Sequence, residues 1–198
     1  MPITDKWKDA IGLPELKGSW LIYGGSGEGK TSLCMQFGKH LSQIVKHKTK
    51  KNEIYYRTAY DSIEEGLSAS IQDAYIRTGM SDVAGWFDLL DKESIDELRI
   101  RLKMKRSPDV LFIDSVQYTG LTPMQYKAFV NDFPDKLFIW LSHADGLNPK
   151  GALAQAIYYD ANVCMLVKGF KAFVKKSRYG GSGEIVISET KAREYYEI

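Results

Sequence analysis

One glycine-rich stretch constrains this chain of 198 residues more than any other. It reads Gly24-Gly25-Ser26-Gly27-Glu28-Gly29-Lys30-Thr31 and is followed by Ser32. The stretch fits G-x-x-x-x-G-K-[ST], the P-loop or Walker A pattern, in which backbone N–H groups surround phosphates. Glycine permits both the close approach and the positive φ angles that such a loop needs. We therefore predict that residues 24–32 bind the phosphates of a nucleotide.

The residues around this stretch predict a strand, a loop and a helix in the order that the motif requires. Residues 20–23 form a short apolar run, which is typical of a buried parallel strand. After the loop, apolar residues recur at helical spacing and predict a helix to about Val45. The start of that helix would direct its N–H groups and its dipole at the bound anion. Lys30 would then reach the β- and γ-phosphates of ATP.

A second motif predicts how the metal is bound. Val110-Leu111-Phe112-Ile113-Asp114 is an apolar run that ends in an acid, the Walker B pattern. In P-loop proteins such an acid lies at the tip of a buried strand beside the loop. We expect Asp114 and the hydroxyl of Thr31 to hold Mg²⁺, with Ser115 helping to shape the site.

Two further strands are expected to bring polar residues to the same edge. Ile54 to Thr58 is predicted to be the second strand, and the acidic segment 61–66 follows it. Residues 136–141 predict another buried strand, which ends in Ser142-His143. Ligands bind at the carboxyl ends of the strands in open α/β sheets. His143 is therefore either a structural histidine or a sensor of the γ-phosphate, and we favour the sensor.

Basic residues gather in two other places. Residues 172–179 and 184–188 flank a glycine-rich turn and predict a β-hairpin. Lys176 and Arg178 share one face of it and are either a solvated edge or directed at a phosphate. The run of Lys46, Lys48, Lys50 and Lys51 around His47 is interpreted as a solvated loop, with a phosphate-contacting patch as the alternative.

Composition restricts the possibilities further. The length and a hydrophobic content of 44% predict one globular domain over residues 1–198, and a net charge of +2 does not by itself indicate a nucleic-acid partner. No apolar run approaches the roughly 20 residues that span a bilayer, and the N-terminus does not resemble a signal peptide. Cys34 and Cys164 are expected to be buried free thiols. These features favour a cytoplasmic protein without membrane contact.

These motifs together resemble the RecA-like ATPase core, which includes RecA and RadA recombinases, the motor domain of DnaB-type helicases, and KaiC. Lys176-Ser177-Arg178-Tyr179-Gly180 resembles the Lys-Asn-Arg-Phe-Gly motif of RadA proteins. Ser62-Ile63-Glu64 resembles the Ser-Leu-Glu of DnaB-type cores. The resemblance implies an α/β fold with a mostly parallel central sheet, flanking helices and a C-terminal β-hairpin. It also implies a bare motor core, a format common in phage and mobile-element proteins.

The resemblance assigns roles to individual residues. Glu64 would orient the attacking water, His143 would take the sensor position, and Lys176 and Arg178 would reach the γ-phosphate of a neighbouring subunit. The active protein would then be a homo-oligomer, a ring or a filament, with ATP and Mg²⁺ at its interfaces. Single-stranded DNA would contact residues 117–123 and 144–151. This chain has a longer approach from strand to acid than the family, so Asp61 and Glu65 stay alternatives to Glu64.

Two other functions are compatible with the same motifs. One is a KaiC-like switch that hydrolyses ATP and binds protein partners in place of DNA. The other is a nucleotide-binding scaffold with little hydrolysis. Our leading hypothesis is a Mg²⁺-dependent ATPase that acts on DNA in recombination, repair or replication.

Overall fold

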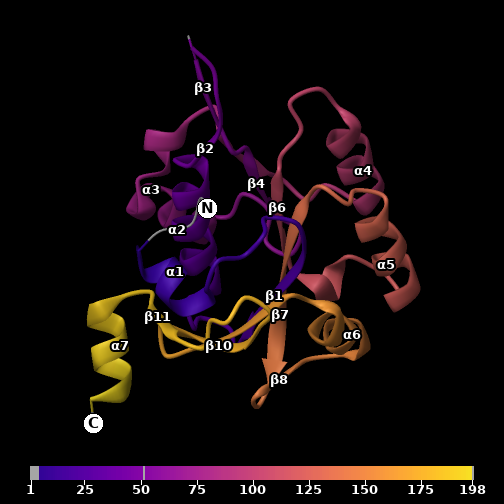
Figure 1. Cartoon of the computed structure of the whole chain (residues 1–198). Coiled ribbons are helices and arrows are strands. Elements are labelled where there is room, and N and C mark those ends of the chain that lie inside the picture. Colours follow the sequence, from indigo (N-terminus) through magenta and orange to yellow (C-terminus); the bar gives the residue numbers. More distant parts are fainter. Residues whose placement is uncertain (1–4, 51, 198) are drawn as a thin grey trace.

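The computed structural model describes residues 5–50 and 52–197 and is built around one large sheet (Figure 1). The strands lie in the order β11-β10-β9-β1-β7-β6-β4-β5, and β8 pairs with β7. The six strands from β9 to β5 run parallel, whereas β10 and β11 are antiparallel to their neighbours. The strands are β1 (Gly18–Gly24), β4 (Thr58–Ser62), β5 (Phe87–Leu90), β6 (Val110–Asp114), β7 (Leu137–Asp145), β8 (Asn148–Pro149), β9 (Val163–Lys168), β10 (Lys171–Ser177) and β11 (Glu184–Val186).

Helices cover both faces of this sheet (Figure 1). One face carries α1 (Asp5–Ile11), α2 (Lys30–Ser42), α3 (Ala69–Thr78) and the 3₁₀ turn η1 (Met80–Val83). The other carries α4 (Ile95–Lys103), α5 (Pro123–Asn131), α6 (Ala152–Asp160) and the 3₁₀ turn η2 (Val116–Tyr118). The last helix, α7 (Glu189–Tyr196), follows β11. We call the face that carries α2 the α2 face and the face that carries α5 the α5 face.

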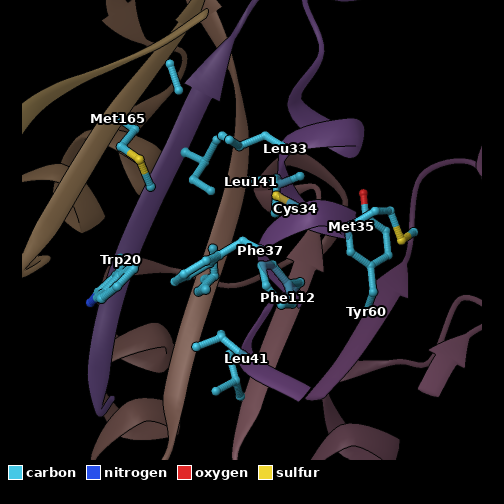
Figure 2. Close-up of a cluster of buried hydrophobic side chains, with 14 of the residues drawn as sticks. Trp20, Leu33, Cys34, Met35, Phe37, Leu41, Tyr60, Phe112, Leu141 and Met165 are labelled. Atoms are coloured by element: carbon cyan, nitrogen blue, oxygen red, sulfur yellow. The ribbon is translucent and has the colours of Figure 1, made fainter. Parts of the chain in front are cut away.

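Large side chains fill the space between the sheet and α2 (Figure 2). The ring of Phe37 from α2 stacks on Trp20 of β1, with ring centroids 5.5 Å apart, and meets Phe112 of β6 edge-on. All three are fully buried. At Gly38 a Cβ would lie 2.6 Å from the Phe87 ring, so glycine lets the helix approach the sheet closely. This packing fixes where α2 begins relative to the strand ends.

The parallel register collects the ends of four strands at one edge, which we call the carboxyl edge. Gly24 at the end of β1 is level with His143 of β7, and Ser62 of β4 is level with Asp114 of β6. The loops that follow these strands therefore emerge side by side. The opposite edge, where the parallel strands begin, is the amino edge.

The prediction for the second strand was wrong. Glu53–Tyr55 is a strand, β3, but it pairs only with β2 (Val45–Lys48) in a separate hairpin that projects from the body (Figure 1). The strand of the main sheet is β4, Thr58–Ser62, which is buried along its whole length although three of its five residues are polar. The aromatic and β-branched signal thus marked the hairpin, while the buried strand gave little hydrophobic signal. Lys51, part of the predicted basic run, lies outside the described residues.

Other elements follow the predictions with shifted ends. The helix after the P-loop ends at Ser42 because the hairpin begins at Val45. A capping box of Ser94 and Glu97 opens α4, which ends at Lys103. In the segment 144–151, where the resemblance put a DNA contact, the end of β7 turns back and pairs Ala144 with Pro149 of β8. The C-terminal hairpin is confirmed, whereas α1 and α7 were not predicted.

Both cysteines are free and buried, as predicted. Within residues 5–50 and 52–197 we find no helix long and apolar enough to cross a membrane.

Candidate nucleotide-binding site

The P-loop has the geometry of an anion site. Gly29 has a φ of 105°, in the left-handed region that favours glycine, and directly precedes α2. As the N-cap residue, Gly29 has no side chain to bond the first N–H groups of α2, which leaves them available to a ligand. A Cβ on Gly29 would lie 3.0 Å from the Phe170 ring. Both the conformation and the space at this position therefore call for glycine.

Lys30 lies over its own loop. Its ammonium donates hydrogen bonds to the carbonyls of Gly24 at 2.9 Å and Gly25 at 2.7 Å. Burial lowers the pKa of Lys30, while Asp114 and other nearby acids oppose that shift. The cation is thus held at the position where phosphates would enter the loop.

A cavity of about 430 Å³ opens in front of the loop. It collects the predicted residues Ser26, Gly27, Gly29, Lys30, Thr31, Ser32, Glu64, Glu65, Asp114 and His143. Glu28 is not among its lining residues. The Glu28 carboxylate accepts a hydrogen bond from the Gly169 N–H, and its carbonyl accepts one from Phe170, so it anchors the P-loop to the turn between β9 and β10.

Asp114 and Thr31 present oxygen atoms on the α2 face. A third residue joins them, because the hydroxyl of Tyr60 donates to the Asp114 carboxylate and lies near Thr31. Burial raises the pKa of Asp114, and the hydrogen bond from Tyr60 and the charge of Lys30 work against that rise. Carboxylate and hydroxyl oxygens are the ligands that Mg²⁺ prefers. Among the described residues there is no cluster of three or more His, Cys, Asp or Glu side chains that could hold a metal.

Glu64 follows β4 by two residues and lies at the centre of a polar group. Its Oε2 accepts a hydrogen bond from the Ser115 hydroxyl at 2.8 Å and lies 3.2 Å from Nε2 of His143. Its N–H donates to the carbonyl of Asp114 at 3.1 Å. Because β4 ends at Ser62, the approach from strand to acid is short. The longer spacing that the sequence suggested came from placing the strand four residues too early.

The two alternatives to Glu64 lie in different surroundings. Asp61 is fully buried on the α5 face, where its Oδ1 accepts the N–H of Glu93, so it points away from the cavity. Glu65 lines the cavity, but its carboxylate accepts hydrogen bonds from Ser68 and Ser70 at the start of α3. Of the three acids, Glu64 is the one that faces both the P-loop and His143.

Lys176 and Arg178 do not line this cavity. The strand β10 runs antiparallel to β9, so they lie toward the amino edge, far along the strand from the P-loop. The Lys176 ammonium donates to the carbonyls of Tyr158 and Tyr159 at the end of α6. Arg178 is exposed. Neither residue reaches the P-loop of its own chain.

Sequence reasoning missed four residues near the site. Tyr60 was assigned to no strand, although its alternation with Asp61 would have placed it on the α2 face. Arg77 of α3 donates to the Ser32 hydroxyl at 3.1 Å. The Lys191 ammonium lies 4.7 Å from the centre of the Phe170 ring. Arg77, Phe170 and Lys191 also line a second cavity of about 510 Å³ that adjoins the first.

No family model matches this chain, and neither does any curated protein sequence. Among solved structures, the chain is similar to the flagellar accessory protein FlaH from Methanocaldococcus jannaschii, with a TM-score of 0.59 and 16% sequence identity. The match covers 90% of this chain and 88% of FlaH. At that identity the likeness speaks for the fold alone. The chain has a RecA-like α/β fold: a mostly parallel sheet flanked by helices, with a P-loop at its carboxyl edge.

Proposed function

We propose that this protein is a Mg²⁺-dependent ATP hydrolase. The observation that carries the proposal is the convergence, in one cavity, of the uncapped start of α2, the oxygens of Thr31 and Asp114, and the carboxylate of Glu64. Phosphoryl transfer to water depends on positioning and on charge neutralisation more than on covalent chemistry. These groups supply both.

Each group has a role in this proposal. The N–H groups of the P-loop and the Lys30 ammonium bind the phosphates, and Lys30 exchanges the carbonyls of Gly24 and Gly25 for phosphate oxygens. Thr31 and Asp114 hold Mg²⁺, which offsets negative charge on the phosphates when bound. Glu64 orients water. His143, already 3.2 Å from Glu64, is placed to respond when a γ-phosphate is present.

The nucleoside is proposed to occupy the adjoining cavity. Phe170 offers a ring that Lys191 covers on one side, and Arg77 is anchored to Ser32 directly after the P-loop. An aromatic ring and a guanidinium are both surfaces on which a base can stack. The two cavities together then accommodate phosphates and nucleoside.

We further propose that the protein acts as a homo-oligomer, a ring or a filament. Arg178 is exposed and far from its own P-loop, which suits a residue that completes a neighbour's site. An arginine supplied in this way accelerates hydrolysis by about 10³ to 10⁵. Lys176 is held by two carbonyls of α6 and would first have to leave them.

Mixing two inactive variants tests the shared site. Arg178→Ala and Lys30→Ala are each expected to lose hydrolysis, and mixing them should restore part of it. One interface in a mixed oligomer then combines an intact P-loop with an intact arginine. If no mixing ratio restores activity, the arginine does not act between subunits.

Single-stranded nucleic acid is our leading proposal for the partner, by resemblance to the recombinase and helicase cores. A protein-binding switch is the second candidate, and one observation favours it. Residues 117–123 and 144–151, where that family contacts DNA, carry a single basic side chain, Lys150. The structural neighbour FlaH is named as a flagellar accessory protein, which also fits a protein partner.

The first experiment is the rate of ATP hydrolysis with Mg²⁺, measured over a range of protein concentrations with and without single-stranded DNA. We expect no hydrolysis in EDTA, a rate that rises more than linearly with protein concentration, and stimulation by DNA. A rate that is steep in protein but indifferent to DNA would support the switch. Tight ATP binding without turnover would support the scaffold.

A further inference from the structure

Positive charge accumulates at the amino edge, at the opposite ends of the strands from the nucleotide cavity. Lys46 of the β2–β3 hairpin and Lys136, just before β7, both approach the carboxylate of Asp109, at 2.6 and 3.9 Å. The single negative charge of Asp109 therefore faces two positive charges. The Lys136 ammonium also donates to the Ser107 hydroxyl at 2.9 Å, which joins the hairpin, the turn before β6 and the start of β7 into one surface.

The cations that extend this surface are not neutralised. Lys103, Lys105 and Arg106, in and after the last turn of α4, are all exposed, as is Lys50 at the hairpin tip. None of these four forms an ion pair with any residue that the structure describes, whereas Lys48 pairs with Glu53. Figure 1 shows the hairpin and the end of α4 on the same side of the molecule, away from β8. We call Lys46, Lys50, Lys103, Lys105, Arg106 and Lys136 the amino-edge cluster.

Two aromatic side chains lie at the same edge, because Tyr55 belongs to the hairpin that carries Lys46 and Trp86 directly precedes β5. The rings of Tyr55 and Trp86 meet edge-on at 5.4 Å, and the Arg57 guanidinium lies 4.8 Å from the Trp86 ring. A cavity of about 410 Å³ is lined by Tyr55, Trp86, Ser42, Gln43, Val83 and Asp82, and the Asp82 carboxylate is paired with Lys39 at 2.7 Å. That volume is within the range of small-ligand cavities. Cations that follow a phosphate backbone, next to rings on which bases stack, are the usual means of binding single strands.

We propose that the amino edge binds single-stranded nucleic acid, with phosphates on the amino-edge cluster and a base against Tyr55 and Trp86. An anionic membrane would also bind the cations, but its headgroups contain no base that could stack on Tyr55 and Trp86. An acidic protein would likewise leave that cavity unfilled. The proposal takes its choice of partner from the proposed function but needs no hydrolysis. It also moves the contact away from the β7–β8 hairpin, where the family resemblance put it.

Charge removal tests the surface. Binding of a fluorescein-labelled 30-mer of oligo(dT) is measured by anisotropy without nucleotide, between 50 and 300 mM salt. In a variant with Lys103→Ala, Lys105→Ala and Arg106→Ala we expect at least a tenfold loss of affinity. The salt slope should fall by about 2, since each single-strand phosphate contact contributes about 0.7. All three residues are exposed and unpaired among the described residues, so the fold should tolerate the change.

A charge-matched control removes three other exposed lysines: Lys8→Ala, Lys150→Ala and Lys175→Ala. Its affinity should stay within about twofold of the unchanged protein. An equal loss in both variants would mean that only net charge matters, and a loss confined to the control would place the contact elsewhere. Either outcome overturns the proposal.

Two more probes test the ligand. An abasic oligomer of equal length should bind at least tenfold more weakly, and equal binding would remove the role of Tyr55 and Trp86. Binding to phosphatidylserine vesicles without binding to the oligomer would replace nucleic acid by a membrane. Lys30→Ala should bind the oligomer normally. If the unchanged protein binds the oligomer but never hydrolyses ATP, the proposed function fails while this inference stands.

Discussion

The two faces of the sheet treat buried polar groups differently, and the difference is clearest at the end of β4. Tyr60 and Asp61 are neighbours in sequence and both are fully buried. On the α2 face the Tyr60 hydroxyl contacts Asp114 and Thr31, beside a group in which Ser115 and His143 approach Glu64. On the α5 face Asp61 keeps one oxygen, Oδ2, with no hydrogen-bond partner among the described residues.

The acids on the α2 face are placed to bind a ligand, whereas the acid on the α5 face destabilises the fold. The polar groups around Asp114 and Glu64 satisfy one another and converge on the cavity, as an organised site requires. Asp61 is isolated by comparison. Burial raises its pKa to about 7, and the N–H of Glu93 only partly offsets that rise. Isosteric substitutions on the two faces should therefore have opposite effects. On the α2 face they should reduce ATP hydrolysis, and on the α5 face they should increase the free energy of unfolding.

The largest effect is expected from Glu64→Gln. Glutamine can still accept the Ser115 hydroxyl, but it no longer polarises water, and a positioned acid or base typically contributes 10²- to 10⁴-fold. We expect hydrolysis to fall by about 10² to 10³, with ATP binding and thermal stability nearly unchanged. Single-turnover kinetics and a fluorescent ATP analogue measure the two separately.

Glu65→Gln is the matched control for that experiment. Its carboxylate is engaged by Ser68 and Ser70, so the substitution should alter hydrolysis by no more than about threefold. If Glu65→Gln lost turnover and Glu64→Gln kept it, the catalytic assignment would pass to Glu65.

On the other face, Asp61→Asn should stabilise the protein. The folded state holds the Asp61 proton up to about pH 7, whereas an unfolded aspartate releases it near pH 3.9. The stability that the protonated form contributes is fully present below the unfolded pKa and is lost as pH rises through 7. An uncharged isostere avoids that loss, so the free energy of unfolding should rise by about 1–3 kcal/mol at pH 8.

Urea unfolding at pH 5 and pH 8 measures this effect. The gain in unfolding free energy should be largest at pH 8 and shrink toward pH 5, while ATP hydrolysis stays unchanged. A loss of hydrolysis comparable to that of Glu64→Gln would show that Asp61 serves the site after all, and would remove the contrast between the faces.

The same strand explains how far the sequence could predict the site. Walker A and Walker B are local patterns, so the P-loop and Asp114 were located without the fold. The strand of Tyr60 was misplaced because Thr58, Asp61 and Ser62 weaken its hydrophobic pattern, while the exposed hairpin beside it is rich in strand-forming residues. Pairing with β5 and β6 makes residues 58–62 the strand of the main sheet, and such long-range pairing leaves no local signal in the sequence. The distance between Lys176 and the P-loop likewise follows from the antiparallel direction of β10.

The smallest effect is expected from Tyr60→Phe, which removes one oxygen from the α2 face. The Asp114 carboxylate would lose its hydrogen bond from Tyr60, and bonds to charged groups contribute about 1.5–3 kcal/mol. Without that bond the Asp114 carboxylate is less firmly oriented and its pKa rises further, so a proton competes better with the metal. We therefore expect half-maximal binding of an ATP analogue to need about tenfold more Mg²⁺. Magnesium titrations of analogue fluorescence measure it without hydrolysis.

Tyr23→Phe is the control on the α5 face. Tyr23 is also buried in a strand of the sheet, where its ring meets Tyr158 edge-on, and its hydroxyl is remote from Asp114. The Mg²⁺ dependence should therefore be unchanged. An equal shift in both variants would mean that removing any buried hydroxyl loosens the sheet. A shift confined to Tyr60→Phe would make Tyr60 a positioning residue for the metal, because its hydroxyl orients the Asp114 carboxylate.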